Sequence, residues 1–217
     1  RQDRKTAPRT PITARLVADL IMASGFNRVI AVDLHAGQIQ GFFNCPFDHL
    51  FPSPVSSAYL LKKYGHEPIT IVSPDAGGTE RARIIAKKLD APLAIVDKRR
   101  SAPNVAQAMN LIGEVEGRVA ILIDDIVDTA GTLSEASRLL RQRGASKVVA
   151  YASHPVFSGP APQRLSESSF DEIIVSDTIP LNDTLKKFNN LTVLSLAPLI
   201  AETIQRIQRN DSVSALF

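Results

Sequence analysis

Apolar and polar residues alternate along this chain in two repeating patterns. Short continuous runs of β-branched and aliphatic residues, typical of strands buried on both faces, are separated by segments whose apolar residues recur at helical spacing. The runs predict strands at 28–33, 69–73, 93–97, 119–123, 147–152, 172–176 and 192–196, and the helical spacing predicts helices near 55–64, 79–89, 132–143 and 198–209. This alternation predicts an α/β fold in which a mostly parallel sheet is flanked by helices.

A further helix is predicted at the start of the chain. Thr10 is a suitable N-cap, Pro11 fits the first helical position, and Gly25 is a stop signal. We therefore expect this helix to begin directly after Thr10.

Two segments interrupt the pattern. The stretch 49–54 contains two prolines and follows a compact aromatic stretch at 41–47, so it is the best candidate for a domain junction. Residues 101–104 include Pro103 and break the pattern after the strand at 93–97, which predicts a mobile loop.

Composition narrows the class of protein. The chain has 217 residues, 44% of them hydrophobic and 22% charged, which argues against a disordered, collagen-like or disulfide-stapled protein. No apolar run reaches the roughly 18 residues of a membrane span, and there is no leader pattern. The lone Cys45 cannot form an internal disulfide, so we expect a reducing cytoplasm. The net charge of +3 is too balanced to imply nucleic-acid binding.

Unusual polar strings follow four of the predicted strands. They are D-L-H-A-G-Q-I-Q-G at 33–41, S-P-D-A-G-G at 73–78, D-K-R-R at 97–100 and D-D-I-V-D-T-A-G-T at 124–132. Ligands of open parallel sheets bind at the carboxyl ends of the strands. These strings are therefore the main functional signal in the sequence.

The string at 124–132 is the most specific of the four. Consecutive backbone N–H groups and the dipole of the helix that follows can cradle a phosphate, and Gly131 allows close approach. Asp124 and Asp125, which follow the predicted strand, would repel a phosphate, so they suit ribose hydroxyls or Mg²⁺ instead. The combination predicts a ribose 5-phosphate pocket. The alternative is an acidic turn that only caps the helix.

The other strings are weaker signals. His35 is a poor ligand for Mg²⁺, which prefers oxygen, and a histidine after a strand is more often structural. Asp75, followed by two glycines, is placed to meet a metal or, alternatively, to shape a turn. The basic run at 98–100 is either solvated surface or a set of cations that stabilise phosphoryl charge.

The string at 124–132 resembles the ribose 5-phosphate loop of the phosphoribosyltransferase-type fold. Together with R-Q-D-R-K at 1–5, D-L-H-A-G-Q-I-Q-G-F-F at 33–43 and S-V-S-A-L-F at 212–217, it makes the whole chain similar to the ribose-phosphate diphosphokinases. This resemblance implies transfer of the β,γ-diphosphoryl group of ATP to the 1-hydroxyl of ribose 5-phosphate, which gives phosphoribosyl diphosphate (PRPP) and AMP.

The resemblance also implies roles for individual residues. It implies ATP contacts by Arg1 and Gln2, an Mg²⁺ site at His35 and Asp75, and catalysis by Lys98 and Arg100 on a flexible loop. It implies ribose 5-phosphate binding by Arg100, Asp124, Asp128, Thr129, Ala130, Gly131 and Thr132, and a regulatory phosphate or ADP site between subunits at Ser212, Ser214 and Phe217. A frayed tail is the alternative for the last three.

The family pattern implies a domain organisation and an assembly. Residues 1–50 would be the last part of a first α/β domain, 51–197 a second similar domain, and 198–217 a terminal helix and tail that pack toward the first. The resemblance implies a homohexamer. In family members, on the order of a hundred further residues, about the length of one domain, precede the R-Q-D-R-K motif. Because the chain opens on Arg1 and not on methionine, we expect a fragment that lacks part of the ATP site.

Two other functions share the phosphate loop. A base phosphoribosyltransferase consumes PRPP and would not need R-Q-D-R-K. A noncatalytic subunit associated with the synthetase would typically alter the basic loop or the metal motif, and both are intact here. A nucleic-acid binder is the weakest alternative, because basic and acidic residues are interleaved.

Overall fold

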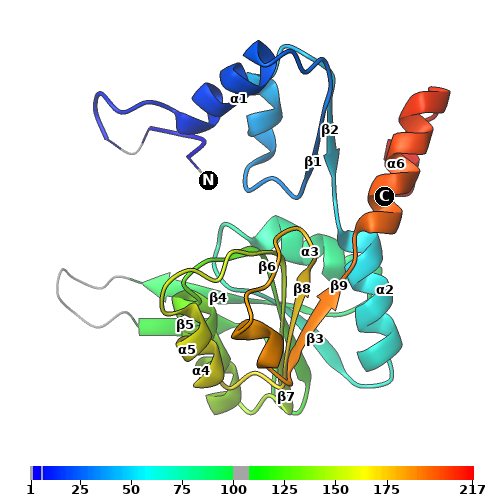
Figure 1. Cartoon of the computed structure of the whole chain (residues 1–217). Coiled ribbons are helices and arrows are strands. Elements are labelled where there is room, and N and C mark those ends of the chain that lie inside the picture. The colour runs from blue at the N-terminus through cyan, green and yellow to red at the C-terminus, as the bar shows by residue number, and fades with distance from the viewer. Residues whose placement is uncertain (1, 6, 100–107) are drawn as a thin grey trace. The chain divides into compact units, whose positions relative to one another are not determined.

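The computed structural model describes residues 2–5, 7–99 and 108–217, with the backbone alone at 98, 99 and 108 (Figure 1). The chain divides into two compact units. The amino-terminal unit comprises Arg1–Pro52 and Thr203–Phe217, and the sheet unit comprises Ser53–Glu202. We describe each unit by itself. The assignment of these units to two domains of the family's type stays a prediction.

The sheet unit is built on seven strands. Their order is β5-β4-β3-β6-β7-β8-β9, and every neighbouring pair is parallel except β4 and β5. The strands are β3 (Ile69–Ser73), β4 (Leu93–Arg99), β5 (Ala108–Ile112), β6 (Val119–Val127), β7 (Lys147–Pro155), β8 (Glu172–Ser176) and β9 (Leu191–Leu194). The predicted α/β fold with a mostly parallel sheet is confirmed.

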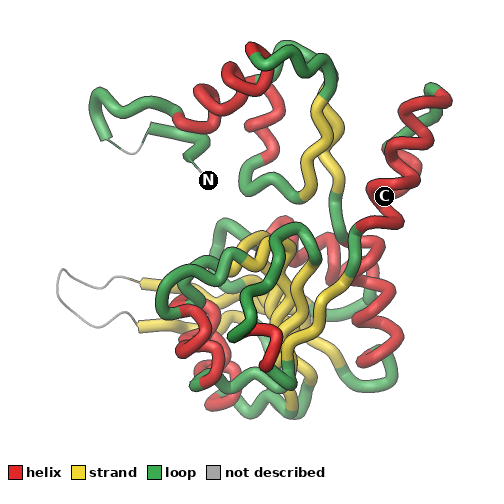
Figure 2. Tube along the Cα trace, viewed as in Figure 1, coloured by secondary structure: helices red, strands yellow, loops and turns green. Residues whose placement is uncertain are grey.

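Helices cover both faces of this sheet (Figure 2). Leu122 of the central strand β6 belongs to an apolar cluster shared with α4 (Gly131–Gln142) and α5 (Ala161–Ser166). Ile121, its neighbour along the strand, belongs to a second cluster shared with α2 (Ser53–Tyr64) and α3 (Thr79–Lys88). Successive side chains of a strand point to opposite faces, so a strand buried on both faces must be continuously apolar.

The sequence pattern did not predict the edge strand β5. Pairing with β5 lengthens the neighbouring strand β4. Asp97 pairs with Asn110 and Lys98 with Met109 in an antiparallel ladder. The prediction that D-K-R-R follows the strand is therefore wrong in part, because β4 continues to Arg99. Arg100 and the loop predicted at 101–104 lie outside the described residues.

The amino-terminal unit holds a small two-stranded parallel sheet. Strand β1 (Val29–Val32) pairs with β2 (Phe47–Leu50), and the 3₁₀ helix η1 (Gly37–Phe42) lies in the crossover between them. The aromatic stretch at 41–47 is thus the end of η1 and the entry to β2. The boundary between the two units falls within the proline-containing segment 49–54.

Helix α1 (Thr13–Ala23) begins later than the sequence predicts. Its N-cap is Ile12, which offers no side-chain hydrogen bond. The hydroxyl of Thr10 instead donates to the carbonyl oxygen of Ala7 at 2.7 Å, so a local turn uses the oxygen that was expected to cap the helix. The predicted stop is confirmed, since Gly25 follows the helix with a φ of 90°.

The remaining described elements are η2 (Leu185–Lys187), α6 (Ala197–Arg209) and η3 (Ser214–Leu216), and the boundary between the units falls inside α6. Within the described ranges, no helix has the length and apolar character needed to cross a membrane.

Candidate active site

The acidic residues of the 124–132 string belong to a strand. Strand β6 runs on to Val127 because β7 pairs with it along its whole length, up to Val127 opposite Pro155. The prediction that Asp124 and Asp125 follow the strand is therefore wrong. Asp125 is buried, and its Oδ1 lies 3.7 Å from Nη1 of Arg81 on α3.

Asp124 has the most perturbed carboxyl group of the candidate site. Its Oδ1 accepts a hydrogen bond of 2.8 Å from the backbone amide of Asp125. Burial, followed by the hydrogen bond and charge of the Asp125 side chain, raises the pKa of Asp124 to about 8, and the charge of Asp75 adds to the effect. A perturbed acid of this kind at the end of a sheet is typical of a functional site.

The turn after β6 has an unusual backbone. Ala130 adopts the left-handed conformation, with a φ of 58°, although its side chain is buried. It is the N-cap residue of α4, and no side-chain hydrogen bond caps that helix. The alternative of an acidic turn that serves only as a cap is therefore wrong. A left-handed residue at the start of a helix forms the concave backbone typical of anion sites.

The turn at residues 128–132, which the sequence predicts to bind phosphate and which is called the phosphate loop below, is held by the segment that follows β7. Ser158 donates through its hydroxyl to Oδ1 of Asp128 and through its amide to the carbonyl oxygen of Asp128 at 3.0 Å. Arg164 donates from Nη1 to the carbonyl oxygen of Thr129 at 3.0 Å. Sequence reasoning missed both residues. The only available signal was that β7 ends beside β6, at the same edge of the sheet.

Asp75 lies in the turn between β3 and α3. Its Oδ1 accepts the backbone amide of Gly78 at 2.9 Å, and its carbonyl oxygen accepts the hydroxyl of Ser73 at 2.6 Å. The alternative of a turn-forming aspartate thus matches these contacts. Asp75 is nevertheless exposed and near enough to Asp124 to raise the pKa of that residue.

The donor atoms can be compared with what Mg²⁺ requires. In the part of the chain that the structure describes, no three or more His, Cys, Asp or Glu side chains form a metal-binding group. Mg²⁺ commonly takes one or two carboxylates and completes its shell with water and substrate phosphates. The neighbouring carboxyl groups of Asp75 and Asp124 fit that pattern. His35 is an exposed residue of the amino-terminal unit and offers nitrogen, the less suitable atom.

The other residues predicted to bind ATP or to act in catalysis are only partly described. Arg1 and Arg100 lie outside the described residues. Gln2 is exposed, and its carbonyl oxygen accepts the amide of Ala14 at 3.1 Å. Lys98 is described only as a backbone position of β4.

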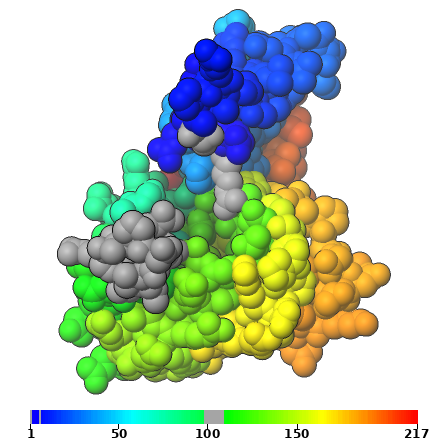
Figure 3. Space-filling model, turned by 90° about the vertical axis from the view of Figure 1, so that its left-hand side faces the viewer, coloured from blue at the N-terminus to red at the C-terminus, as the bar shows by residue number. Residues whose placement is uncertain are grey.

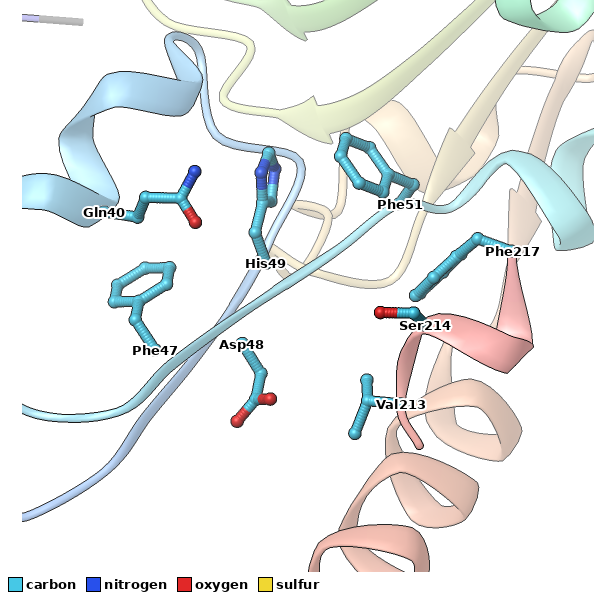
Figure 4. Close-up of a pocket in the computed structure, with 8 residues that line it drawn as sticks. All are labelled: Gln40, Phe47, Asp48, His49, Phe51, Val213, Ser214 and Phe217. Atoms are coloured by element: carbon cyan, nitrogen blue, oxygen red, sulfur yellow. The ribbon is translucent and has the colours of Figure 1, made fainter. Parts of the chain in front are cut away.

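A separate pocket of about 400 Å³ lies within the amino-terminal unit (Figure 4). The ring of Phe217 meets that of Phe51 edge to face with centroids 5.6 Å apart, and Phe51 lies 4.3 Å from the ring of His49. The last residue of the tail is thus in contact with Phe51. The pocket includes two of the three predicted regulatory residues, and its lining is Gln40, Phe47, Asp48, His49, Phe51, Val213, Ser214 and Phe217.

These features define a class of protein. The sheet unit is an α/β fold with an anion-type loop and an acidic group at the carboxyl edge of its parallel strands, an arrangement typical of proteins that bind phosphorylated sugars and nucleotides. The family model described as the phosphoribosyl synthetase-associated domain matches residues 78–217.

Individual relatives point to the same family of enzymes. The ribose-phosphate pyrophosphokinase of Synechococcus elongatus is 56% identical over 219 residues, which cover 100% of this chain and 66% of that protein. The enzyme of the same name from Caldanaerobacter subterraneus is 54% identical over 217 residues, which cover 100% and 68%. The crystal structure of phosphoribosylpyrophosphate synthetase from Mycobacterium smegmatis matches with a TM-score of 0.89 and 44% identity, over 96% of this chain and 68% of that one.

The chain belongs to the ribose-phosphate pyrophosphokinase family. It spans 66% of the length of the Nostoc and Synechococcus relatives that it matches.

Proposed function

We propose that the protein acts as a ribose-phosphate diphosphokinase, which transfers the β,γ-diphosphoryl group of ATP to the 1-hydroxyl of ribose 5-phosphate. One observation carries the proposal. The left-handed turn at Ala130 opens helix α4 shortly after a strand that carries a half-buried acid with a raised pKa, Asp124, in a chain of this family. The backbone amides of the turn suit a phosphate, and the carboxyl group suits sugar hydroxyls. A phosphorylated sugar needs both close together.

The phosphate loop has the main binding role in this mechanism. The backbone amides and hydroxyls of residues 129–132 bind the 5-phosphate, aided by the dipole of α4. Asp124 and Asp128 accept hydrogen bonds from the ribose hydroxyls. Asp128 can do so in a fixed orientation because Ser158 holds its carboxyl group.

The substrate supplies its own nucleophile, the 1-hydroxyl, so the reaction requires no enzymic Ser or Cys. Attack at the β-phosphorus concentrates negative charge on the phosphoryl oxygens. Lys98 and Arg100 stabilise that charge as cations. Arg1 and Gln2 contact ATP.

Asp75, with His35, would hold Mg²⁺. When bound, this ion neutralises charge on the phosphates of ATP. The carboxyl group of Asp75 supports this assignment because it is exposed and has a second acidic group, Asp124, nearby.

The proposal extends to assembly and regulation. The protein would act in the cytoplasm as a homohexamer with active sites near subunit interfaces, without nucleic-acid or membrane partners. Ser212, Ser214 and Phe217 would form a regulatory phosphate or ADP site. The ordered tail and its pocket in the amino-terminal unit support this role.

Product analysis tests the proposed activity. ATP and ribose 5-phosphate are incubated with the protein and Mg²⁺, and AMP and PRPP are quantified together. The proposal expects AMP and PRPP in equal amounts and none of either without ribose 5-phosphate. Consumption of added PRPP with a free base would instead identify a phosphoribosyltransferase. No turnover, in a folded protein that binds ribose 5-phosphate, would contradict the proposed activity of this chain.

A further inference from the structure

Arg164 lies closer to the phosphate loop than any sequence argument anticipates. Its Nη1 donates to the carbonyl oxygen of Thr129 at 3.0 Å. The same nitrogen lies 3.2 Å from the point where a Cβ atom on Gly131 would stand. A guanidinium group thus borders the space that glycine leaves open at the start of α4.

The element that carries Arg164 is firmly placed. Helix α5 buries Ala161 and Leu165 in the apolar cluster that it shares with α4. The hydroxyl of Ser134 on α4 donates to the carbonyl oxygen of Arg164 at 3.3 Å. Figure 3 shows the surfaces of these two helices, yellow-green and yellow, on one face of the sheet unit.

One segment holds three consecutive carbonyl groups of the turn. Phe157 donates its amide to Val127 at 2.9 Å, Ser158 donates its amide to Asp128 at 3.0 Å, and Arg164 bonds Thr129. The C=O and N–H groups of one peptide point in opposite directions. When the carbonyl oxygen is held on one side of the loop, the N–H group of that peptide therefore points to the other side. The segment 157–164 therefore fixes the direction in which the loop amides point.

We propose that Arg164 is a positioning residue of the phosphate loop: it fixes the turn through the Thr129 carbonyl, and glycine at position 131 lets the guanidinium lie there without being shifted. This inference rests on the proposed function for the identity of the ligand, ribose 5-phosphate. The positive charge of Arg164 beside the loop also favours a phosphorylated sugar over the free sugar.

The first test needs no ligand. Hydrogen exchange is measured on the 217-residue chain for the wild type, Arg164→Met, Arg164→Lys and the control Arg138→Met, which removes an exposed arginine of α4. We expect the amides of residues 128–132 to exchange about tenfold faster in Arg164→Met, since one charge-assisted hydrogen bond is lost. Arg164→Lys restores part of the protection and Arg138→Met changes nothing. Unchanged exchange in Arg164→Met would overturn the proposal.

The second test uses ribose 5-phosphate and ribose as probes in calorimetric titrations. Arg164→Met should weaken ribose 5-phosphate binding about tenfold and leave ribose binding unaltered. If the wild type binds no ribose 5-phosphate, the proposed function fails, and the exchange data still decide whether Arg164 holds the loop.

A double-mutant cycle tests the part played by Gly131. Gly131→Ala should weaken ribose 5-phosphate binding in the wild type, because its methyl group pushes the guanidinium a few tenths of an ångström from its place at the Thr129 carbonyl, and should add no loss in Arg164→Met. Fully additive losses would show that the methyl group meets the ligand itself and would overturn the coupling of these two residues.

Discussion

The backbone amide of Asp125 lies 2.8 Å from Oδ1 of Asp124, so two consecutive residues of β6 share a hydrogen bond where the strand approaches the phosphate loop. Their carboxyl groups cannot both ionise freely in a buried place, and burial together with Asp125 raises the pKa of Asp124 to about 8. Asp124 therefore titrates near neutral pH.

Asp124→Asn should change how stability depends on pH. An unfolded aspartate has a pKa near 3.8, whereas folded Asp124 keeps its proton until about pH 8. The folded state binds the extra proton between these values, so the wild type loses stability relative to Asp124→Asn as the pH rises through this interval. Urea unfolding at pH 5 and pH 8 measures the difference, with the exposed Asp19→Asn as control. Equal differences at the two pH values would contradict the raised pKa.

Glu172 should be a main contributor to the stability of the sheet unit. Its buried carboxylate accepts hydrogen bonds from Tyr59 at 2.7 Å, Lys63 at 2.7 Å and Thr192 at 2.6 Å, and from the hydroxyl of Tyr64. Burial alone would raise the pKa of Glu172, but these hydrogen bonds, Lys63 foremost, hold it below its usual value. The stabilisation is therefore present above the unfolded pKa and is lost as the pH falls through the folded one.

Removing that carboxylate should cost much more than removing an exposed one. We expect Glu172→Gln to lower the free energy of unfolding by about 2–4 kcal/mol. Glu67→Gln, which breaks a more exposed pair with Lys147, should cost about 0–1 kcal/mol. Chemical denaturation at pH 7 compares the two variants. Similar losses in both would show that the Glu172 network stabilises the fold no more than a surface pair.

Lys98→Ala should lower turnover about a hundredfold or more and change ribose 5-phosphate binding little, because a cation that meets developing phosphoryl charge acts in the transition state. The AMP-forming assay measures turnover and calorimetry measures binding. Lys88→Ala, at the end of α3, is the matched control. An unchanged turnover number in folded Lys98→Ala would exclude the proposed catalytic role.

Phe217→Ala should impair the regulatory site. The edge-to-face contact with Phe51 closes one side of the pocket, and its loss removes about 1 kcal/mol of stabilisation from the tail. Inorganic phosphate is titrated with ribose 5-phosphate at saturation, so that the phosphate loop is filled. We expect weaker phosphate binding in Phe217→Ala than in Leu216→Ala, which does not line the pocket. Equal affinities in both variants would contradict a regulatory role for Phe217.

The pattern of apolar residues predicted best those strands that are buried on both faces of the sheet. The strand at 69–73 is continuously apolar because helices cover both faces of the sheet, and its bounds agree with β3. The predicted strand at 119–123 ended too early, because an aspartate looks like the end of a buried run. Pairing with β7 extends β6 through both acidic residues. An edge strand such as β5 has no comparable apolar run, so only the tertiary pairing reveals it.

The candidate site could be proposed from sequence only where its residues form one continuous string. The loop at 128–132 stands out because neighbouring residues can together supply the amides and hydroxyls of a phosphate site. Ser158 and Arg164 could not, since they lie 30 and 35 residues from their partners Asp128 and Thr129. Contacts over such distances depend on how β7 and α5 pack, and no local pattern encodes that.

A pair of calorimetric titrations, with ribose 5-phosphate and with ribose, tests directly whether residues 128–132 bind the phosphate. We expect ribose 5-phosphate to bind at least about tenfold more tightly than ribose, since the loop amides recognise the phosphate. Thr132→Val should reduce this preference, because the loop loses one hydroxyl donor to the phosphate. Equal affinities for the two sugars, or a preference unchanged in Thr132→Val, would contradict the assignment of residues 128–132 as the ribose 5-phosphate loop.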